Sequence, residues 1–549
     1  MAPLSFFLRQ LLLGVSAARA MAATDPALLA LQACRRMPPK IANLLAVPAQ
    51  KLPSGPVICQ LLARNLEGAA NRVGARPTNQ LEAAVLALAG RPVPPTFRAA
   101  HARYLQRLGR LPEAVEAAPR RLRPRLQAIA AVQTPRFQLH PSSLASRSYQ
   151  IPTGRHRVLH VLTNSLPHTQ SGYTLRSQQI LAGQRRQNMA VRAFTRLGYP
   201  LVIGKLAHAN IEQLGGVEYG RILPGRWPAF LPARLQAQAE ALAQQANTFA
   251  PNVLHTTTDF KNALMTRAVA ERFALPWVYE MRGELESTWL SKLPPAAREG
   301  GQRTWQYRTL ARKETQLANA ASAVVVLSKV HRQRLIDRGV NPQKIYVVPN
   351  LPANPPAPCS KAQARQQLRL PDGEYLFGSI SSLVPYEGFE TAILALKELK
   401  RQGRRARLLL VGFGESLPAL RALAKREQVA DLVDFVGKVS PQQARLWYKA
   451  LDCFVIPRRD EPVCRTVTPI KGMEAIAAGT PIVSSNLPAL AELTPPAPSG
   501  YLVEPTDIAT WAKTIWRAMT QPPLAPPRLR TWEDNVKIYD SIYQKIRGL

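Results

Sequence analysis

Cysteine is scarce in this chain of 549 residues, and no two of its five cysteines form a Cys-x-x-Cys pair. They stand at positions 34, 59, 359, 453 and 464. This odd number without a metal-like motif favours reduced thiols in a cytoplasmic protein. Beyond the N-terminus, no segment offers the roughly 18 consecutive apolar residues that a membrane-spanning helix requires.

Acidic residues are also few, with 35 Asp and Glu against 72 Lys and Arg, and the net charge is +37. Such a charge favours anionic partners, namely nucleotide sugars, phospholipid head groups, anionic glycans or nucleic acid. The basic residues are spread along the chain, and no nucleic-acid reader motif accompanies them. We therefore expect no nucleic-acid partner. The sequence does not indicate the oligomeric state.

The first twenty residues resemble a signal sequence in part. They hold an apolar run and end in Ala18-Arg19-Ala20, which imitates a signal peptidase site. However, Arg9 interrupts the run and no basic residue precedes it. These departures favour a retained, cytoplasmic segment over a secreted protein.

The composition of residues 1–150 predicts an α-helical extension followed by a linker. This region is rich in Ala, Leu and Arg, and residues 81–90 and 103–118 carry the apolar pattern of paired helices. A Pro-rich stretch over 134–153 is expected to be the linker. The extension could serve as a docking module.

From Arg157 onward, short apolar runs alternate with helical stretches. This alternation predicts doubly wound parallel sheets. We expect one sheet domain over 151–350 and a second over 351–530, with a Pro-rich hinge at 351–358. The predicted strands lie at 156–162, 191–194, 252–255, 277–280, 323–327, 345–348, 375–381, 406–412, 432–439, 453–456 and 481–485.

The segment from Cys453 to Ser485 is the most informative part of the chain. It reads as strand, basic loop, helix and strand, which is one unit of a parallel sheet. Ligands of such sheets bind at the carboxyl ends of the strands. The carboxylate of Glu474 suits a sugar hydroxyl, and Arg458 and Lys471 suit phosphate oxygens. The alternative is a helix cap beside a solvated basic loop.

The words PRRD, TPIK and MEAIAAGTPIVSS in this segment resemble the carboxy-terminal signature of family 4 glycosyltransferases, which have the GT-B fold. The wording YEG and VTPIK points to a subgroup of that family. In the family, two glutamates contact the donor, and the second binds the nucleotide ribose. Glu474 matches the second, whereas Thr466 occupies the place of the first. Thr466, Arg465 or Glu461 could substitute for the missing carboxylate.

The resemblance implies a two-domain architecture. Two Rossmann-like domains would face each other across a cleft, after the α-helical extension. The domain at 151–350 would lie on the acceptor side, and the domain at 351–530 would bind the nucleotide sugar. Residues 531–549 resemble the family's closing helix, which crosses back to the first domain.

Two loops of the first domain also match the family. The loop with Gly172 follows the first strand, and in the family its backbone amides approach the donor diphosphate and the acceptor. Arg282 stands where many relatives have a histidine that meets the donor sugar, and Glu284 or Glu286 could orient it. The alternatives are an ordinary turn for Gly172 and a structural salt bridge for Arg282. His255 is either a cleft residue or, more commonly, a core imidazole.

A loop of the second domain contains Tyr386 and Gly388, and it matches the family's phosphate-side loop. The usual Arg and Lys of that loop are absent. The positive charge for a diphosphate would then come from Arg458 and Lys471. Tyr386 and Gly388 are included among the expected donor contacts.

The implied reaction is transfer of a glycosyl unit from a UDP-, GDP- or ADP-sugar to an acceptor hydroxyl, with retention of configuration. No Asp-x-Asp motif occurs, and we expect neither a metal nor a cofactor. The family's usual setting implies polysaccharide or glycolipid synthesis on a glycan or lipid-linked acceptor. It also implies a peripheral position at an anionic inner membrane face. The rival interpretations are a non-catalytic GT-B-like scaffold and a nucleotide-sugar 2-epimerase.

Overall fold

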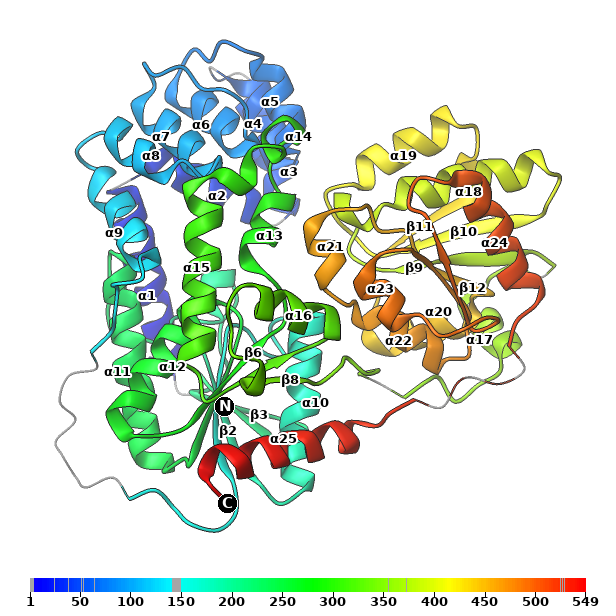
Figure 1. The fold of residues 1–549 in the computed structure, drawn as a ribbon. Coiled ribbons are helices and arrows are strands. Elements are labelled where there is room, and N and C mark those ends of the chain that lie inside the picture. Colours follow the sequence, from blue (N-terminus) through cyan, green and yellow to red (C-terminus); the bar gives the residue numbers. More distant parts are fainter. Residues whose placement is uncertain are drawn as a thin grey trace. The chain divides into compact units, whose positions relative to one another are not determined.

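The structure is a computed structural model that describes residues 4–549 except 24, 38, 51, 53, 64, 141–149, 354, 372, 524, 526 and 528. The chain forms two compact units. The first contains residues 1–170, 184–324 and 543–549, and the second contains 171–183 and 325–542. The first unit holds an N-terminal helical region and most of one sheet, and the second holds the other sheet together with residues 325–347, which include the edge strand of the first sheet (Figure 1).

The N-terminal region is helical, as the composition predicts. Its helices are α1 (Leu4–Ala22), α2 (Pro26–Arg36), α3 (Pro39–Ala49), α4 (Gly55–Leu62), α5 (Leu66–Val73), α6 (Gln80–Ala89), α7 (Arg98–Arg107), α8 (Leu111–Ala117) and α9 (Arg123–Gln133). Among the described residues before Arg157 there is no strand. Small alanines let α6 and α7 pack closely around a shared apolar core. Residues 141–149 of the predicted linker lie outside the described part of the chain.

Helix α1 packs one face against the first unit and presents the other to solvent. Phe6 and Leu13 are buried beside Leu223, and the Gln10 amide exchanges two hydrogen bonds with the backbone of Ala207. The exposed face carries large apolar side chains at helical spacing. These are Leu4, Leu8, Leu11, Leu12 and Val15. Within the described part of the chain, α1 is long and apolar enough to cross a membrane. A signal sequence near the N-terminus would have the same properties.

The first sheet is parallel except at one edge. Its strands are β1 (Arg157–Leu162), β2 (Ala190–Thr195), β3 (Ile211–Leu214), β4 (Val217–Gly220), β5 (Val253–Thr257), β6 (Trp277–Met281), β7 (Ala323–Val326) and β8 (Ile345–Val347). Their order in the sheet is β3-β4-β2-β1-β5-β6-β7-β8. The strand order reverses beside β1, and this is where open α/β sheets bind ligands. The antiparallel pair β3–β4 was not predicted from the sequence.

Three long helices of the first unit accompany this sheet, and a fourth, α10 (Gly172–Arg186), belongs mainly to the second unit. The three are α11 (Leu231–Phe249), α12 (Phe260–Phe273) and α15 (Trp305–Ala320). Asp259 and Thr304 cap the N-termini of α12 and α15 through their side-chain oxygens. The shorter helices of this region are α13 (Leu285–Ser291), α14 (Pro295–Arg298) and α16 (Lys329–Asp337).

The second sheet has the strand order β11-β10-β9-β12-β13-β14 and is parallel throughout. Its strands are β9 (Tyr375–Ile380), β10 (Ala406–Val411), β11 (Val433–Gly437), β12 (Cys453–Ile456), β13 (Ile482–Ser485) and β14 (Gly500–Val503). The order reverses between β9 and β12. Strand β14 was not predicted from the sequence.

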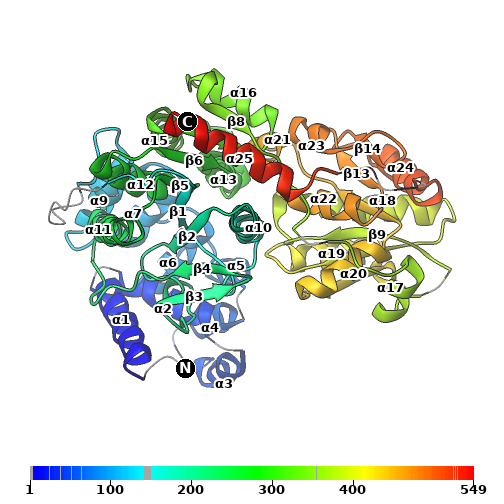
Figure 2. The same cartoon turned by 90° about the horizontal axis from the view of Figure 1, so that it is seen from below.

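Helices cover both faces of the second sheet (Figures 1 and 2). They are α17 (Lys361–Leu368), α18 (Phe389–Arg401), α19 (Leu417–Arg426), α20 (Pro441–Ala450), α21 (Pro462–Thr466), α22 (Ile470–Ala477), α23 (Pro488–Leu493) and α24 (Ile508–Thr520). Helices α18, α19 and α24 share one apolar core with the strands, and α20 and α22 share another. Two such layers explain why the strands are apolar on both faces.

The last helix, α25 (Trp532–Arg547), contributes to both units. Its residues up to Ile542 belong to the second unit, and Tyr543–Leu549 belong to the first. In the second unit, the Trp532 indole donates to the carbonyl oxygen of Pro352 at 2.7 Å. The predicted closing helix is therefore present as a helix.

Candidate functional site

The polar residues of the second sheet gather where its strand order reverses. Strand β9 ends at Ile380 and is followed by Ser381, while β12 ends at Ile456 and is followed two residues later by Arg458. The two strands pair directly, with Phe454 opposite Gly378. Their carboxyl ends therefore meet at the position at which ligands of open α/β sheets bind.

Arg458 is buried at this position, and its side chain is held on several sides. Its Nη2 donates to Glu387 Oε1 at 3.1 Å, and its Nη1 donates to the Val467 carbonyl oxygen at 2.8 Å. The guanidinium also lies 5.8 Å from the centre of the Tyr386 ring. Only 7% of the side chain is exposed, so Arg458 contributes its charge mainly from below the protein surface.

Lys471 is the more accessible of the two cations. Its Nζ lies 3.8 Å from Glu387 Oε1 and donates to the hydroxyl of Ser381, and 28% of the side chain is exposed. Burial lowers the pKa of Lys471, while the Glu387 charge opposes that shift. Lys471 can therefore reach an anion that arrives from solvent.

Glu387 holds both cations and was not singled out from the sequence. Burial would raise its pKa, but the charges of Arg458 and Lys471 outweigh burial, so the pKa of Glu387 lies below its usual value. One carboxylate facing two cations leaves an excess positive charge. The cluster of Ser381, Glu387, Arg458 and Lys471, which we call the cationic cluster, is thus suited to an anionic ligand.

Tyr386 and Gly388 form the loop that carries Glu387. Gly388 has φ +68°, and a Cβ atom there would lie 1.9 Å from the Pro457 carbonyl oxygen. Only glycine permits this close approach between the two loops. The carbonyl oxygen of Tyr386 accepts from the Arg459 amide at 3.1 Å. Burial, together with Glu387, raises the pKa of the Tyr386 phenol to about 12.

Glu474 lies in the second turn of α22, the helix that begins one residue before Lys471. Its Oε1 accepts a hydrogen bond from the backbone amide of Ala353 at 2.8 Å. Ala353 belongs to the Pro-rich segment at 351–358 that was predicted as a hinge. The carboxylate is therefore oriented by the backbone of that segment.

Gly172 lies close to α22 in the second unit. It is the first residue of α10, and a Cβ atom there would be 3.5 Å from Ile470 Cγ2, which is ordinary contact. Arg176, one turn later, is buried and donates to the carbonyl oxygens of Val348 and Pro349, each at 2.8 Å. The start of α10 is thus fixed beside the helix that carries Lys471 and Glu474.

Thr466 and Arg465 lie on α21 but face different surroundings. Thr466 is buried, and its hydroxyl lies 3.5 Å from the Pro462 carbonyl oxygen of its own helix. Arg465 is exposed and forms an ion pair with Asp460 at 2.5 Å. The structure therefore brings together Glu474, Lys471, Arg458, Tyr386, Gly388 and Gly172, whereas Arg465 points to the surface.

In the first unit, Arg282 follows β6, one strand away from β1 and β5, between which the strand order reverses. Its Nη2 donates to Glu280 Oε2 at 3.1 Å, and its backbone amide donates to Thr258 Oγ1 at 2.8 Å. Glu280 is an ion-pair partner that the sequence did not indicate. Glu284, an expected partner, accepts a hydrogen bond from Ser287 at 2.6 Å.

Glu280 and Arg282 belong to a longer buried network. His255 Nε2 lies 3.1 Å from Glu280 Oε2, and His255 Nδ1 lies 2.6 Å from the Tyr543 hydroxyl. That hydroxyl also accepts from Gln184, whose carbonyl lies 2.8 Å from His160 Nε2. Burial, with His255 nearby, lowers the pKa of His160 well below its usual value. His255 is a bonded core imidazole, the second of the two interpretations.

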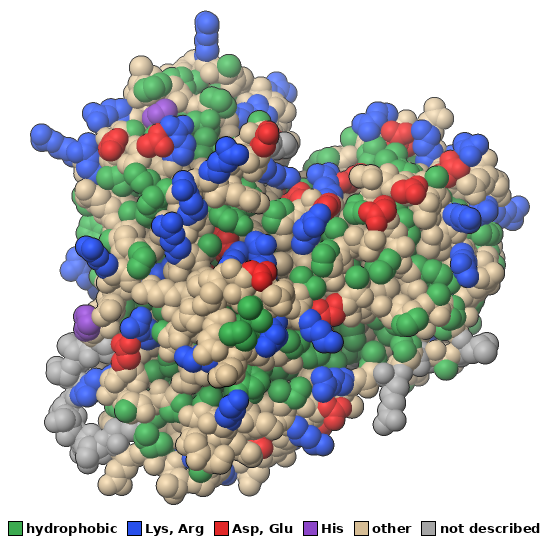
Figure 3. Space-filling view, viewed as in Figure 1, with side chains coloured by type: hydrophobic (Ala, Val, Ile, Leu, Met, Phe, Trp, Pro, Cys, Tyr) green, Lys and Arg blue, Asp and Glu red, His purple; other side chains and the backbone are tan. Residues whose placement is uncertain are grey.

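Among the described residues, no group of three or more His, Cys, Asp or Glu side chains could hold a metal ion. The five cysteines are free thiols, and Cys453 and Cys464 are buried. Lys and Arg side chains are spread over the visible face in Figure 3 and do not gather into one patch. The cationic cluster therefore stands out by its burial and its place in the sheet.

The fold of the two sheet domains is GT-B, the fold of glycosyltransferases with two Rossmann-like domains. Sucrose-phosphate synthase from Thermosynechococcus elongatus is similar in structure, with a TM-score of 0.54 and 18% sequence identity. The match covers 71% of this chain and 98% of that chain. A likeness at this identity concerns the fold, and it confirms the predicted fold class of two parallel-sheet domains after a helical region.

Family comparisons assign both domains more closely. Residues 171–351 match "Glycosyl transferase 4-like domain", and residues 360–537 match "Glycosyl transferases group 1". The chain therefore carries these two glycosyltransferase domains. They confirm the predicted likeness to family 4 at the level of the domains.

Two curated relatives match over part of their length. D-inositol 3-phosphate glycosyltransferase of Segniliparus rotundus is 31% identical over 224 residues, which is 40% of this chain and 48% of the relative. A GDP-mannose-dependent alpha-(1-6)-phosphatidylinositol monomannoside mannosyltransferase of Mycobacterium tuberculosis is 34% identical over 133 residues, 24% of this chain and 34% of the relative. The chain thus spans about half or less of the length of these relatives.

Proposed function

We propose that this protein is a retaining glycosyltransferase of family 4, in the subgroup with YEG and VTPIK wording. It transfers a glycosyl unit from a nucleotide diphosphate sugar to an acceptor hydroxyl in polysaccharide or glycolipid synthesis. The observation that carries this proposal is the cationic cluster at the strand-order reversal of the domain that matches glycosyl transferases group 1. A diphosphate is the anion that such a cluster suits.

Lys471 is the group that contacts the donor phosphates in this proposal. It is the partly exposed cation of the cluster, and a charge-assisted hydrogen bond to phosphate would replace the one to Ser381. Arg458 does not contact the phosphates directly in this proposal, because Glu387 and the Val467 carbonyl oxygen already accept hydrogen bonds from its guanidinium. Its charge adds to the field at the phosphates in a site of low dielectric constant.

Glu474 binds the ribose hydroxyls of the donor. The hydrogen bond from Ala353 supports this role, because it orients the carboxylate. Thr466 replaces the first glutamate of the family pattern. Its burial within α21 favours a supporting role, and it leaves the donor-sugar contact to a neighbouring group such as Glu461.

In the proposed reaction, the bond between the anomeric carbon and the β-phosphate oxygen breaks, and a bond to the acceptor oxygen forms on the same face. The acceptor proton passes to the leaving phosphate. Gly172 lies at the N-terminus of α10, whose amides and dipole favour negative charge. Arg282 stays protonated, so it binds oxygens and does not act as a base. We expect no metal and no cofactor to take part.

The acceptor is expected to be a glycan or a lipid-linked glycan at a cytoplasmic, anionic membrane face. The exposed apolar face of α1 supports this location. Leu4 is 85% exposed and Leu12 is 61% exposed, and α3 also exposes apolar side chains. Residues 1–66 contain seven Lys and Arg but a single acidic residue, Asp25. An apolar helix face in basic surroundings suits anionic lipid surfaces.

The transfer activity can be tested by incubating the purified full chain with UDP-, GDP- and ADP-sugars and measuring the nucleoside diphosphate released. We expect release with at least one donor, and loss of it in Glu474→Ala with an unchanged circular dichroism spectrum. Thr315→Ala, on helix α15 of the first unit, is a matched control that should keep full activity. Unchanged turnover in Glu474→Ala would refute the ribose role.

Calorimetry separates the enzyme from a non-catalytic scaffold. We expect UDP, GDP or ADP to bind in the micromolar to low millimolar range, and Lys471→Ala to weaken the binding. A scaffold would show no binding of any nucleoside diphosphate at millimolar concentration. Deuterium exchange at sugar C2 without transfer would instead indicate a 2-epimerase.

The membrane location can be tested by flotation with vesicles of phosphatidylcholine and phosphatidylglycerol. We expect the full chain to float with anionic vesicles, and the double variant Leu8→Gln/Leu12→Gln to lose about tenfold or more of this binding. Leu502→Gln, which changes an exposed leucine of β14, is the control. Equal flotation of the double variant and the control would contradict the role of α1.

A further inference from the structure

The first unit contains a cavity of about 480 Å³ between the helical region and α13. Its walls come from α2, α6, α7, α9, the α13 end and the start of α15. A cavity of this size lies in the range of small-molecule sites, which is about 300–1,000 Å³. The donor-site residues of the second unit take no part in it.

Most of the wall is apolar. Leu28, Leu31, Leu88 and Ile129 line it together with several alanines, and Trp289 closes it at α13. Small alanine side chains leave the space open, because each lacks the atoms that a leucine would insert. This part of the cavity suits a hydrocarbon chain.

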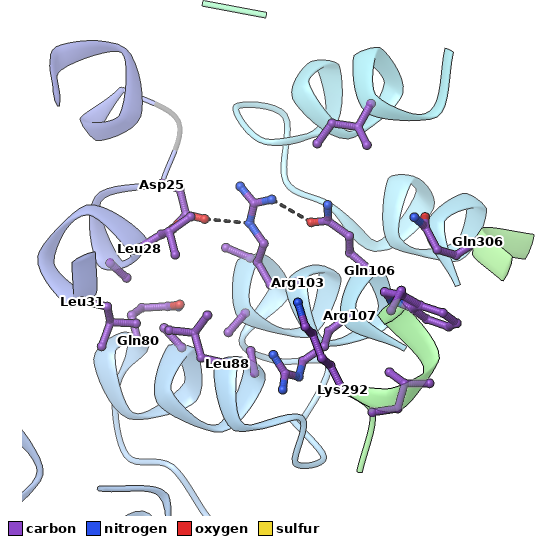
Figure 4. A pocket seen from close by; sticks show the side chains of 18 of the residues that line it. Asp25, Leu28, Leu31, Gln80, Leu88, Arg103, Gln106, Arg107, Lys292 and Gln306 are labelled. Atoms are coloured by element: carbon purple, nitrogen blue, oxygen red, sulfur yellow. Dashed lines mark hydrogen bonds and ion pairs between the residues drawn. The ribbon is translucent and has the colours of Figure 1, made fainter. Parts of the chain in front are cut away.

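The polar part of the wall is strongly basic. Arg103, Arg107 and Lys292 line the cavity, and Asp25 is the one acidic residue among the described lining residues. Figure 4 shows Arg107 and Lys292 extending into the middle of the view, with Arg103 above them. Three cations against one carboxylate leave an excess of positive charge that an anion would offset.

Arg103 and Gln133 each place in the wall a buried polar atom that has no hydrogen-bond partner among the described residues. Arg103 donates from Nε to Asp25 Oδ2 and from Nη1 to Gln106 Oε1, each at 2.8 Å. Its buried Nη2 has no hydrogen-bond partner among the described residues. The buried Oε1 of Gln133, which is only 5% exposed, is also unpaired. Leaving such atoms buried and unpaired is unfavourable, so they point to a missing partner.

We propose that this cavity binds a single-chain amphiphilic anion, with its apolar chain along α2 and α6 and its anionic head at Arg103, Arg107 and Lys292. The head would be a carboxylate or a phosphate monoester. A head of this kind accepts hydrogen bonds from Arg103 Nη2 and from Lys292. A phosphate monoester that retains one proton also donates to Gln133 Oε1.

The site is connected by sequence to a functional loop of the first unit. Trp289 and Lys292 belong to α13 and its C-cap, and this helix begins after Glu284, two residues beyond Arg282. A ligand packed against Trp289 would restrain α13. Occupancy should therefore be visible as slower amide hydrogen exchange in residues 285–291.

The proposal is tested by titrating the full chain with laurate, dodecyl phosphate and uncharged dodecanol below their aggregation concentrations. Trp fluorescence and calorimetry report the binding. We expect saturable binding of at least one anion at one per chain, with dodecanol at least tenfold weaker. Binding of laurate alone or of dodecyl phosphate alone would identify the head group, and each outcome supports the site.

Variants locate the binding within the cavity. Lys292→Gln removes an exposed cation of the wall, and Ala84→Phe fills the apolar part; we expect each to weaken binding at least tenfold. Arg110→Gln is the matched control, because Arg110 lies outside the wall in an exposed pair with Glu113. Unchanged melting temperatures, with nucleoside diphosphate release as in the wild type, would show that these variants remain folded.

Three results would overturn the proposal. The first is absence of saturable binding of either anion, and the second is binding equally strong for dodecanol. The third is binding that Lys292→Gln and Ala84→Phe leave unchanged. Slower exchange elsewhere than in residues 285–291 would place the ligand at another site and would also contradict it.

Discussion

Each sheet holds an arginine beside a glutamate near the carboxyl end of a strand, at the strand-order reversal in the second sheet and one strand away from it in the first, but the two pairs differ in charge balance. In the first sheet, Glu280 meets Arg282 and the bonded imidazole of His255, and the network is buried. In the second sheet, Glu387 meets Arg458 and also Lys471, which is partly exposed. One cluster is balanced, whereas the other carries an extra positive charge.

This difference explains how two similar positions can serve different purposes. A balanced, buried pair mainly fixes a loop, because its charges are satisfied within the protein. A cluster with one cation in excess, and with that cation open to solvent, gains from an incoming anion. The second sheet is therefore the better candidate for binding a diphosphate.

The largest effect is expected from removing one partner of the buried pairs. Arg458→Met should lower the free energy of unfolding by about 3–5 kcal/mol, because Glu387 would remain buried with less compensation. Arg282→Met should cost less, about 1–3 kcal/mol, because His255 still contacts Glu280. Chemical denaturation of both variants measures the difference. Equal losses of unfolding free energy in the two variants would contradict the proposed difference in charge balance between the clusters.

The next effect concerns the exposed cation. Lys471→Ala should raise the donor KM or lower kcat/KM by about 10- to 100-fold, which corresponds to a charged hydrogen bond of about 1.5–3 kcal/mol. Steady-state kinetics with the preferred nucleotide sugar measures it. Lys449→Ala, on the neighbouring helix α20, is a control that should change these constants less than twofold. An unaltered profile for Lys471→Ala would argue against a phosphate contact.

A buried carboxyl group whose pKa is not lowered by a neighbouring cation should contribute to stability with the opposite pH dependence from that of Glu387. Burial raises the pKa of Glu314 to about 8, although the Tyr279 hydroxyl and the Phe260 amide donate to it. The folded state then binds a proton more tightly than the unfolded state. The resulting stabilisation is complete below the unfolded pKa, near 4.5, and is lost as the pH rises to about 8.

Denaturation between pH 5 and 8 tests this difference. Glu314→Gln should flatten a decline in stability that approaches about 1.4 kcal/mol per pH unit for one proton. Glu387→Gln should not flatten this decline. The pKa of Glu387 is lowered in the folded state, so its contribution to stability is present above the unfolded pKa and is lost only at acidic pH. A wild-type stability that is flat from pH 5 to 8 would contradict the raised pKa of Glu314.

The smallest effect is expected at the surface. Arg465 and Asp460 form an exposed pair, and such pairs contribute about 0–1 kcal/mol. Arg465→Ala should therefore change the melting temperature little and the donor KM by less than about twofold. A tenfold rise in KM would show that Arg465 leaves Asp460 and contacts the donor.

Much of the fold could be predicted, because the buried strands are short apolar runs between Gly- and Pro-rich turns. The missed hairpin β3–β4 turns at Gly215-Gly216, a recognisable signal that its short, largely exposed strand β3 obscured. Strand β14 is four residues long and leaves Leu502 exposed, so it carried little apolar pattern.

The site could be predicted only in part. Glu474, Lys471 and Arg458 share one segment, and the type and spacing of the residues pointed to phosphate and sugar chemistry. Glu387 was missed as their anchor because it lies 71 residues before Arg458 in a different loop. Contacts between loops depend on which strands become neighbours, and this order is not encoded in local spacing.

The shared position of α25 has a consequence for synthesis of the chain. Tyr543 lies 288 residues after His255, and its hydroxyl joins His255 to Gln184 in the interior of the first unit. During translation, the earlier residues emerge long before this tyrosine does. The interior of the first unit therefore stays incomplete until Tyr543 has left the ribosome, so a truncation that removes Tyr543 should impair the domain whose first strand, β1, begins at Arg157.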